Sequence, residues 1–135
     1  MSEEFLHTLT PAEGEALEDM GEPRTYPPGS VIFEQGGTAD CVLLVRTGRV
    51  RITARGAQGQ DVVLAERGPG ELLGDLGAID GQPRSASVTA LEEVRGLVVP
   101  LRAFRGFVMD HPRAAISLLE LLSRRLRESD AQRVR

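Results

Sequence analysis

The chain is poor in the residues that build disulfides and metal centres. Its 135 residues include one cysteine, Cys41, two histidines, His7 and His111, and no Trp. A single cysteine cannot form an internal disulfide or hold a cysteine-based metal or iron–sulfur site. Two histidines near opposite ends of the chain do not supply a histidine-rich metal centre either. We therefore expect no metal site and no structural disulfide.

Basic charge and long apolar runs are also scarce. Lysine is absent, and 16 arginines face 20 acidic residues, for a net charge of −4, which argues against a general binder of polyanions. No apolar run is long enough to cross a bilayer, and the first residues, Met-Ser-Glu-Glu, lack the basic start of a signal peptide. We expect a soluble, cytoplasmic domain with no membrane partner.

What is present suits one compact globular domain over residues 1–135. With 41% hydrophobic and 27% charged residues, the chain has enough apolar material for a core. We divide it into a helical start at about 1–21, a barrel at about 22–100 and C-terminal helices at about 101–130.

Helical structure is predicted before residue 21. Thr10-Pro11-Ala12-Glu13 forms a capping box with proline at the first helical position, which predicts a helix to about Met20. A shorter helix is expected over Glu3–Leu9. Gly21 and the prolines that follow it end the helical pattern.

Short β-rich runs separated by turn residues occupy the middle of the chain. Val50–Arg55 and Asp61–Glu66, for example, flank the predicted hairpin loop Gly56–Gln60. Strands so short and closely spaced are typical of an antiparallel barrel or jelly roll rather than of parallel βαβ units.

After Pro100 the periodicity becomes helical. Leu101–Asp110 and Arg113–Asp130 are predicted helices on either side of His111-Pro112, and Phe104 and Phe107 are expected in the core. The second helix carries apolar residues at alternating four- and three-residue spacing, as in a coiled-coil seam. These residues are Ala115, Leu119, Leu122 and Leu126. The seam either packs on the chain's own barrel or forms a dimer, and the periodicity favours neither.

The segment 70–88 carries the clearest chemical pattern. Gly74-Asp75 leads into one predicted helical turn over Leu76–Ile79, whose free N–H groups favour an anion. Gly77 has no side chain, so its backbone can approach a ligand, and Arg84 can offer a planar fork of donors to the same anion. Asp75 would be costly beside an anion unless it accepts hydrogen bonds from groups such as sugar hydroxyls.

Gly74-Asp75-Leu76-Gly77, followed by Arg84-Ser85-Ala86, resembles the phosphate-binding cassette of cyclic nucleotide-binding domains. Such domains occur in Crp-Fnr regulators, in regulatory subunits of cAMP-dependent protein kinase and in cyclic nucleotide-gated channels. The resemblance extends over nearly the whole chain. It also includes Tyr26–Phe33 with Gln35-Gly36, the turn Thr47–Val50, and Arg124-Arg125-Leu126.

The resemblance implies an α+β, mainly β fold: an eight-stranded antiparallel jelly-roll barrel with short N-terminal helices and two C-terminal helices. It implies the following roles at matching positions. The cyclic phosphate is expected at Gly77, Arg84, Ser85 and Ala86, and the ribose at Gly74, Asp75 and Leu76. Ile52 and Leu64 are expected to line the pocket, and Ser129 and Asp130 are possible contacts to the base.

One position departs from the pattern of the family, which usually has Glu where this chain has Asp75. The shorter carboxylate predicts weaker affinity or a changed ligand rather than loss of the site, because Arg84 is present. Ser85, where Thr often accompanies a cGMP preference, favours cAMP.

These residues predict a cyclic nucleotide sensor, either the effector domain of a Crp-family transcriptional regulator or a stand-alone signalling domain. The resemblance also implies a homodimer through the C-terminal helix. The chain ends at Arg135 without a recognition helix, so we expect no specific DNA binding by this chain alone. The alternative is a domain of the same fold that serves dimerisation or docking without nucleotide. An enzyme of cupin type is disfavoured, because neither histidine lies in the barrel.

Overall fold

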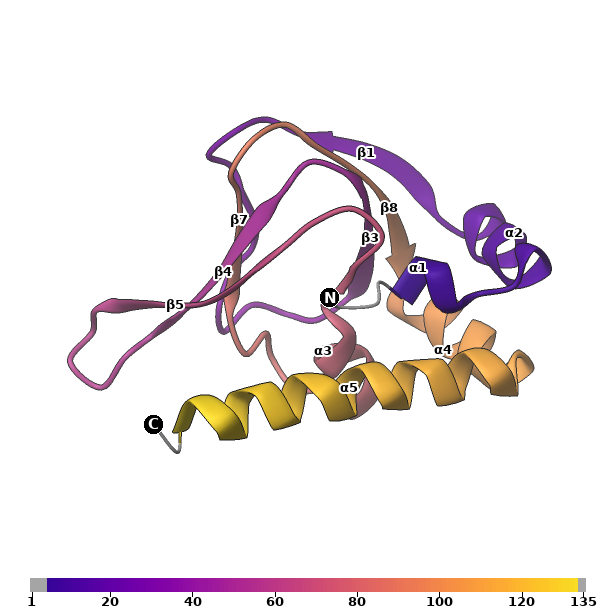
Figure 1. Cartoon of the computed structure of the whole chain (residues 1–135). Helices are drawn as coiled ribbons and strands as arrows, with labels where there is room; N and C mark the ends of the chain where they lie inside the picture. Colours follow the sequence, from indigo (N-terminus) through magenta and orange to yellow (C-terminus); the bar gives the residue numbers. More distant parts are fainter. Residues whose placement is uncertain (1–4, 134–135) are drawn as a thin grey trace.

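The computed structural model describes residues 5–133, without the side chains of Asp75, Leu76, Ala78 and residues 129–133. Two short helices, α1 (Phe5–Thr8) and α2 (Pro11–Asp19), precede the strands. One helical turn, α3 (Asp75–Asp80), lies between two of the strands, and α4 (Leu101–Asp110) and α5 (Pro112–Arg133) end the chain. In Figure 1, α5 runs beneath the barrel while α1, α2 and α4 gather at one side of it.

Eight strands form two antiparallel sheets of four, in the orders β1-β8-β3-β6 and β2-β7-β4-β5. This arrangement confirms the predicted jelly roll. The strands are β1 (Glu22–Tyr26), β2 (Val31–Phe33), β3 (Cys41–Thr47), β4 (Val50–Arg55), β5 (Asp61–Arg67), β6 (Leu72–Leu73), β7 (Ser87–Ala90) and β8 (Val94–Pro100). Proline is tolerated at position 23 because β1 is an edge strand that pairs only with β8.

The capping box predicted from the sequence starts α2. Glu13 N–H donates to the Thr10 hydroxyl at 3.2 Å, and Thr10 N–H donates to Glu13 Oε1 at 2.8 Å. The Glu13 carboxylate also makes a contact between distant parts of the chain. Arg113 Nη2, at the start of α5, donates to Glu13 Oε1 at 2.6 Å. This ion pair holds the pKa of the Glu13 carboxyl below its ordinary value, through the Arg113 hydrogen bond first and the Thr10 N–H second. The ion pair thereby joins α2 to the start of α5.

One apolar cluster lies between the helices and the sheet that contains β3 and β8. We call it the helical cluster. Its buried members are Phe5, Leu17, Val42, Leu44, Leu72, Leu97, Val99, Phe104, Phe107, Ala114, Leu118 and Leu121. Phe104 and Phe107 are both 1% exposed, which confirms their predicted place in the core.

A second apolar cluster fills the space between the two sheets. We call it the barrel cluster. Its buried members are Leu43, Val45, Val50, Leu73, Val88, Ala90, Val94 and Val98. Because side chains alternate along a strand, Val42 and Leu44 of β3 join the helical cluster while Leu43 and Val45 face the barrel.

The long helix α5 presents different faces to the fold and to solvent. Ala114, Leu118 and Leu121 pack on the chain's own domain. Two residues of the predicted seam, Leu119 and Leu126, are 59% and 60% exposed, and the other two, Ala115 and Leu122, are half-buried. The face that covers the domain is therefore displaced from the predicted seam, and half of the seam remains open to solvent.

The hairpin of β4 and β5 extends away from the barrel (Figure 1). Val62, Val63 and Leu64 of its edge strand β5 are exposed. The loop at its tip closes with Gly56 N–H donating to Gln60 O at 2.7 Å, which confirms the predicted hairpin loop.

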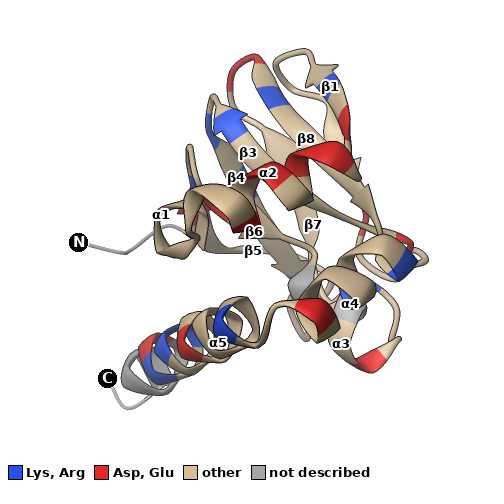
Figure 2. Cartoon of the chain, turned by 90° about the vertical axis from the view of Figure 1, so that its right-hand side faces the viewer, with Lys and Arg blue, Asp and Glu red and all other residues tan. Residues whose placement is uncertain are grey.

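Along α5, basic and acidic positions are interspersed rather than gathered (Figure 2). None of the helices in residues 5–133 is long and apolar enough to span a membrane.

Candidate functional site

The turn predicted between Gly74 and Gly81 is the helix α3, which begins and ends at glycines. Gly74 caps its start with φ 85°, and Gly81 caps its end with φ 70°. Only glycine adopts these left-handed conformations without strain. Gly77, inside the turn, is buried, and a Cβ there would collide with the side chain of Ala39. Close packing therefore requires glycine at this position.

Arg84 is held in place by its own backbone. Its N–H donates to Gly37 O and its carbonyl accepts from Gly36 N–H, both at 2.8 Å, so the loop between β2 and β3 fixes the peptide from both sides. The residue is only 7% exposed. A charged side chain is rarely so buried unless its donors are satisfied.

Carbonyl oxygens and an aromatic ring satisfy the Arg84 guanidinium. Nη2 donates to Cys41 O at 2.7 Å, and Nη1 donates to Gly74 O at 3.3 Å. The guanidinium carbon lies 3.8 Å from the centroid of the Phe33 ring, in cation–π geometry. These carbonyls use two of the five N–H groups of a guanidinium, which leaves donors for an anionic ligand.

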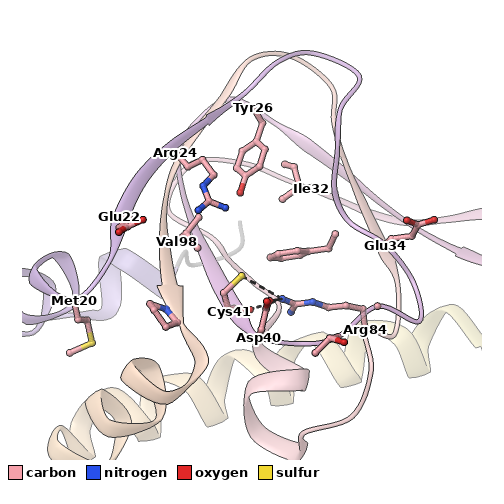
Figure 3. Close-up of a pocket in the computed structure, with 14 residues that line it drawn as sticks. Met20, Glu22, Arg24, Tyr26, Ile32, Glu34, Asp40, Cys41, Arg84 and Val98 are labelled. Atoms are coloured by element: carbon pink, nitrogen blue, oxygen red, sulfur yellow. Dashed lines mark hydrogen bonds and ion pairs between the residues drawn. The ribbon is translucent and has the colours of Figure 1, made fainter.

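The surroundings of Arg84 include a thiol and a carboxylate, both drawn in Figure 3. Cys41 Sγ lies 3.7 Å from Nη2, and Asp40 Oδ1 lies 3.9 Å from it. Burial, and secondly the nearby Asp40, raises the pKa of the Cys41 thiol. The thiol thus stays protonated at neutral pH. Because the Asp40 side chain is 78% exposed, its attraction to Arg84 is strongly screened.

A cavity of about 660 Å³ opens beside Arg84 and lies against α5. We call it the α5 cavity. The predicted residues that line it are Ile52, Leu64, Gly74, Gly77, Arg84, Ser85 and Ala86. The structure thus brings together predicted residues from β4, β5, the cassette turn and the segment before β7. The side chains of Asp75, Leu76, Ser129 and Asp130 lie outside the described part of the structure.

Other residues line the α5 cavity that were not predicted as site residues. They are Phe33, Ala65, Arg67, Leu73, Val88, Leu122, Arg125, Leu126 and Glu128. Arg125 and Leu126 belong to the motif quoted from the last helix, and Leu122 and Leu126 to the predicted seam, so the sequence contained a signal for them. Phe33 likewise ends the quoted run Tyr26–Phe33. The sequence contained no signal for Arg67, whose inward orientation depends on strand register.

Arg125 also ties α5 to the barrel, since its Nη2 donates to Leu72 O at 3.1 Å. Arg67 lies 3.7 Å from Glu71 Oε1, and its Nε is buried without a hydrogen-bond partner among the described residues. Three guanidiniums and one carboxylate, that of Glu128, therefore line the described wall of the cavity. This wall suits an anionic ligand with an apolar body.

The described lining combines guanidiniums, the Glu128 carboxylate and apolar side chains. Among its described members there is no histidine, cysteine, lysine or tyrosine, and arginine does not give up its proton in proteins. The arrangement can hold an anion at Arg84 and cover an apolar group with Ile52, Leu64 and Val88.

Comparisons with known proteins agree with this geometry. The family model of the cyclic nucleotide-binding domain matches residues 23–111. The chain is 36% identical over 128 residues to the cyclic AMP receptor protein of Thermus thermophilus. This alignment covers 95% of the chain and 59% of the relative. It is 32% identical over 122 residues to a CRP-like cAMP-activated global transcriptional regulator of Mycobacterium tuberculosis. This alignment covers 90% of the chain and 54% of the relative.

Among solved structures, the crystal structure of the Thermus thermophilus catabolite activator protein matches with a TM-score of 0.86 at 36% identity. The match covers 95% of this chain and 60% of that one. The chain therefore spans somewhat more than half the length of the relatives it matches.

Proposed function

Because the chain belongs to the cyclic nucleotide-binding domain family, we propose that the α5 cavity binds cyclic AMP and that the domain acts as a sensor of that ligand. The observation that carries the proposal is the placement of Arg84. It is buried at the wall of a cavity that also contains Gly77, Ser85 and the apolar side chains of Ile52 and Leu64. A cyclic nucleotide combines one phosphate charge with a flat base, which matches a guanidinium beside an apolar wall.

The roles of the other predicted residues follow from this pose. The phosphate accepts from Arg84 and lies against Gly77, Ser85 and Ala86, while Asp75 accepts from the ribose hydroxyl beside Gly74 and Leu76. The base packs on Ile52 and Leu64 and meets α5, where Ser129 and Asp130 are its proposed partners. Ser85 favours cyclic AMP over cyclic GMP. The bound ligand also contacts α5, because Leu122 and Leu126 of this helix line the same cavity.

We extend the proposal to the assembly. The exposed apolar side chains of Ile116, Leu119 and Leu126 on α5 suit a homodimer in which this helix meets its copy. The chain would then act as the ligand-binding part of a transcriptional regulator, as the names of its relatives suggest. Sedimentation velocity checks the dimer: a chain that stays monomeric at high micromolar concentration contradicts it.

Calorimetric titration with cyclic AMP and cyclic GMP tests the ligand. We expect the wild-type chain to bind cyclic AMP in the micromolar range or tighter. Arg84→Ala should weaken binding about tenfold to a hundredfold, since charge-assisted hydrogen bonds to the phosphate are lost. Arg102→Ala, at an exposed position of α4, is the matched control and should bind like the wild type. Absence of binding to the wild type, or equal binding to Arg84→Ala, would overturn the proposal.

A further inference from the structure

A second cavity, of about 530 Å³, lies at the open mouth of the barrel beside β1 (Figure 3). We call it the β1 cavity. It takes residues from β1, β2, the start of β3 and the end of β8. Phe33 and Arg84 line both this cavity and the α5 cavity, so these two side chains form the wall between them.

Polar side chains of β1 lie on the barrel side of this edge strand, where Glu22 and Arg24 are exposed and Tyr26 is half-buried. Glu22 pairs with Val98 and Tyr26 with Val94, and both valines belong to the barrel cluster. Since alternate residues share a face, Arg24 faces the interior together with Glu22 and Tyr26. In Figure 3, the guanidinium of Arg24 and the hydroxyl of Tyr26 point into the β1 cavity.

These inward polar groups have no partner within the described part of the protein. Neither the Arg24 guanidinium nor the Tyr26 hydroxyl makes a hydrogen bond or an ion pair with a described residue. Arg84, by contrast, is engaged by Cys41 O and Gly74 O. Arg24 and Tyr26 therefore offer free donors on the β1 side of the cavity.

The remaining lining restricts the charge of an occupant. Three exposed carboxylates, those of Glu22, Glu34 and Asp40, line the cavity together with two guanidiniums. The excess of acid disfavours a phosphate or a dicarboxylate, with a repulsion that solvent screens at these exposed carboxylates, and a simple amine would meet Arg24. A ligand with one carboxylate and one ammonium satisfies both kinds of group. Ile32, Phe33 and Val98 provide an apolar surface for the rest of it.

We propose that the β1 cavity binds a small zwitterion with an apolar side chain, of the class of leucine or phenylalanine. Its carboxylate accepts from the Arg24 fork and the Tyr26 hydroxyl. Its ammonium group donates to the carboxylate of Asp40, and its side chain packs against Ile32 and Phe33. The site is separate from the nucleotide site, and its assignment does not depend on cyclic nucleotide binding.

Calorimetry with L-phenylalanine and L-leucine tests the proposal on the full chain. Binding to the wild type should weaken about tenfold or more in Arg24→Gln, which keeps polar hydrogen-bonding groups and removes the charged fork. Arg102→Gln should bind like the wild type. Phenethylamine and hydrocinnamate, each lacking one of the two charges, should bind at least about tenfold more weakly than phenylalanine. No binding of either amino acid, equal binding by Arg24→Gln, or equal binding of the singly charged analogues overturns the proposal.

Alkylation of Cys41 tests where the amino acid binds, because Cys41 is the only cysteine of the chain and lines the β1 cavity. Its raised pKa predicts slow alkylation by a neutral maleimide near pH 7. Saturating phenylalanine should slow the reaction further in the wild type and not in Arg24→Gln. An alkylation rate unchanged by an amino acid that does bind would place it elsewhere and overturn the assignment.

Discussion

The helical cluster and the barrel cluster share strands β3 and β8 but are filled differently. The helical cluster contains the rings of Phe5, Phe104 and Phe107, each 1% exposed, whereas the buried members of the barrel cluster are Val, Leu and Ala. The smaller side chains leave room for two cavities and for the buried guanidinium of Arg84. We infer that the helical cluster, outside the barrel, contributes most to stability, while the interior of the barrel keeps space for a ligand.

The largest expected effect tests this division through stability. Phe104→Ala should lower the free energy of unfolding by about 3–5 kcal/mol, because it empties a fully buried ring site in the helical cluster. Val50→Ala, at a fully buried position of the barrel cluster outside both cavities, should cost only about 2 kcal/mol. Urea denaturation followed by circular dichroism measures both. Equal costs would show that the buried ring of Phe104 stabilises the fold no more than the smaller side chain of Val50.

A smaller effect is expected at the wall between the cavities. Phe33→Leu keeps an apolar side chain but removes the ring that stacks on Arg84, and should weaken cyclic AMP binding about fivefold. Phe33→Tyr keeps the aromatic face and should restore most of the affinity. Titration calorimetry on both variants decides. If the Leu and Tyr variants bind equally, the ring serves only as packing.

The smallest effect concerns the ion pair that closes the helical layer. Arg113 lowers the pKa of Glu13, so the folded state binds fewer protons than the unfolded chain as the pH falls. The stabilisation is complete above the unfolded pKa of a glutamate, about 4.3, and is lost as the pH falls through the lower, folded pKa. The melting temperature of the wild type should therefore decrease in this acid range.

Glu13→Gln separates the charge from the capping contact, because glutamine also serves the capping box. Its melting temperature should depend less on pH below about 4.3 than that of the wild type. Glu15→Gln, at an exposed position of the same helix, should follow the wild type. A wild-type acid dependence that persists in Glu13→Gln would assign it to other carboxylates.

Local patterns made much of the fold predictable from the sequence. The Thr10–Glu13 capping box placed the start of α2, and His111-Pro112 placed the break between α4 and α5. The cassette turn was expected over Leu76–Ile79 and is the helix Asp75–Asp80, a difference of one residue at each end. These features depend on residues close together in the chain, so their determinants are visible in the sequence.

Long-range packing was much less predictable. Glu22–Tyr26 contains Pro23 and charged residues, and its role as a strand depends on its pairing with β8. The stacking of Phe33 on Arg84 and the orientation of Arg24 and Arg67 depend on register between distant strands. On α5, helical periodicity indicated an apolar seam, but the face that contacts the fold is set by the position of the barrel.

The protruding strand β5 also has a consequence for how the protein behaves at high concentration. An edge strand with exposed Val62, Val63 and Leu64 offers unpaired backbone groups and apolar side chains to another chain, a pattern prone to aggregation. Asp61 and Glu66 flank this run and oppose intermolecular pairing by charge. Leu64 cannot be made polar in the same way, because it lines the α5 cavity. Ligand binding and resistance to aggregation therefore place opposite demands on this one residue.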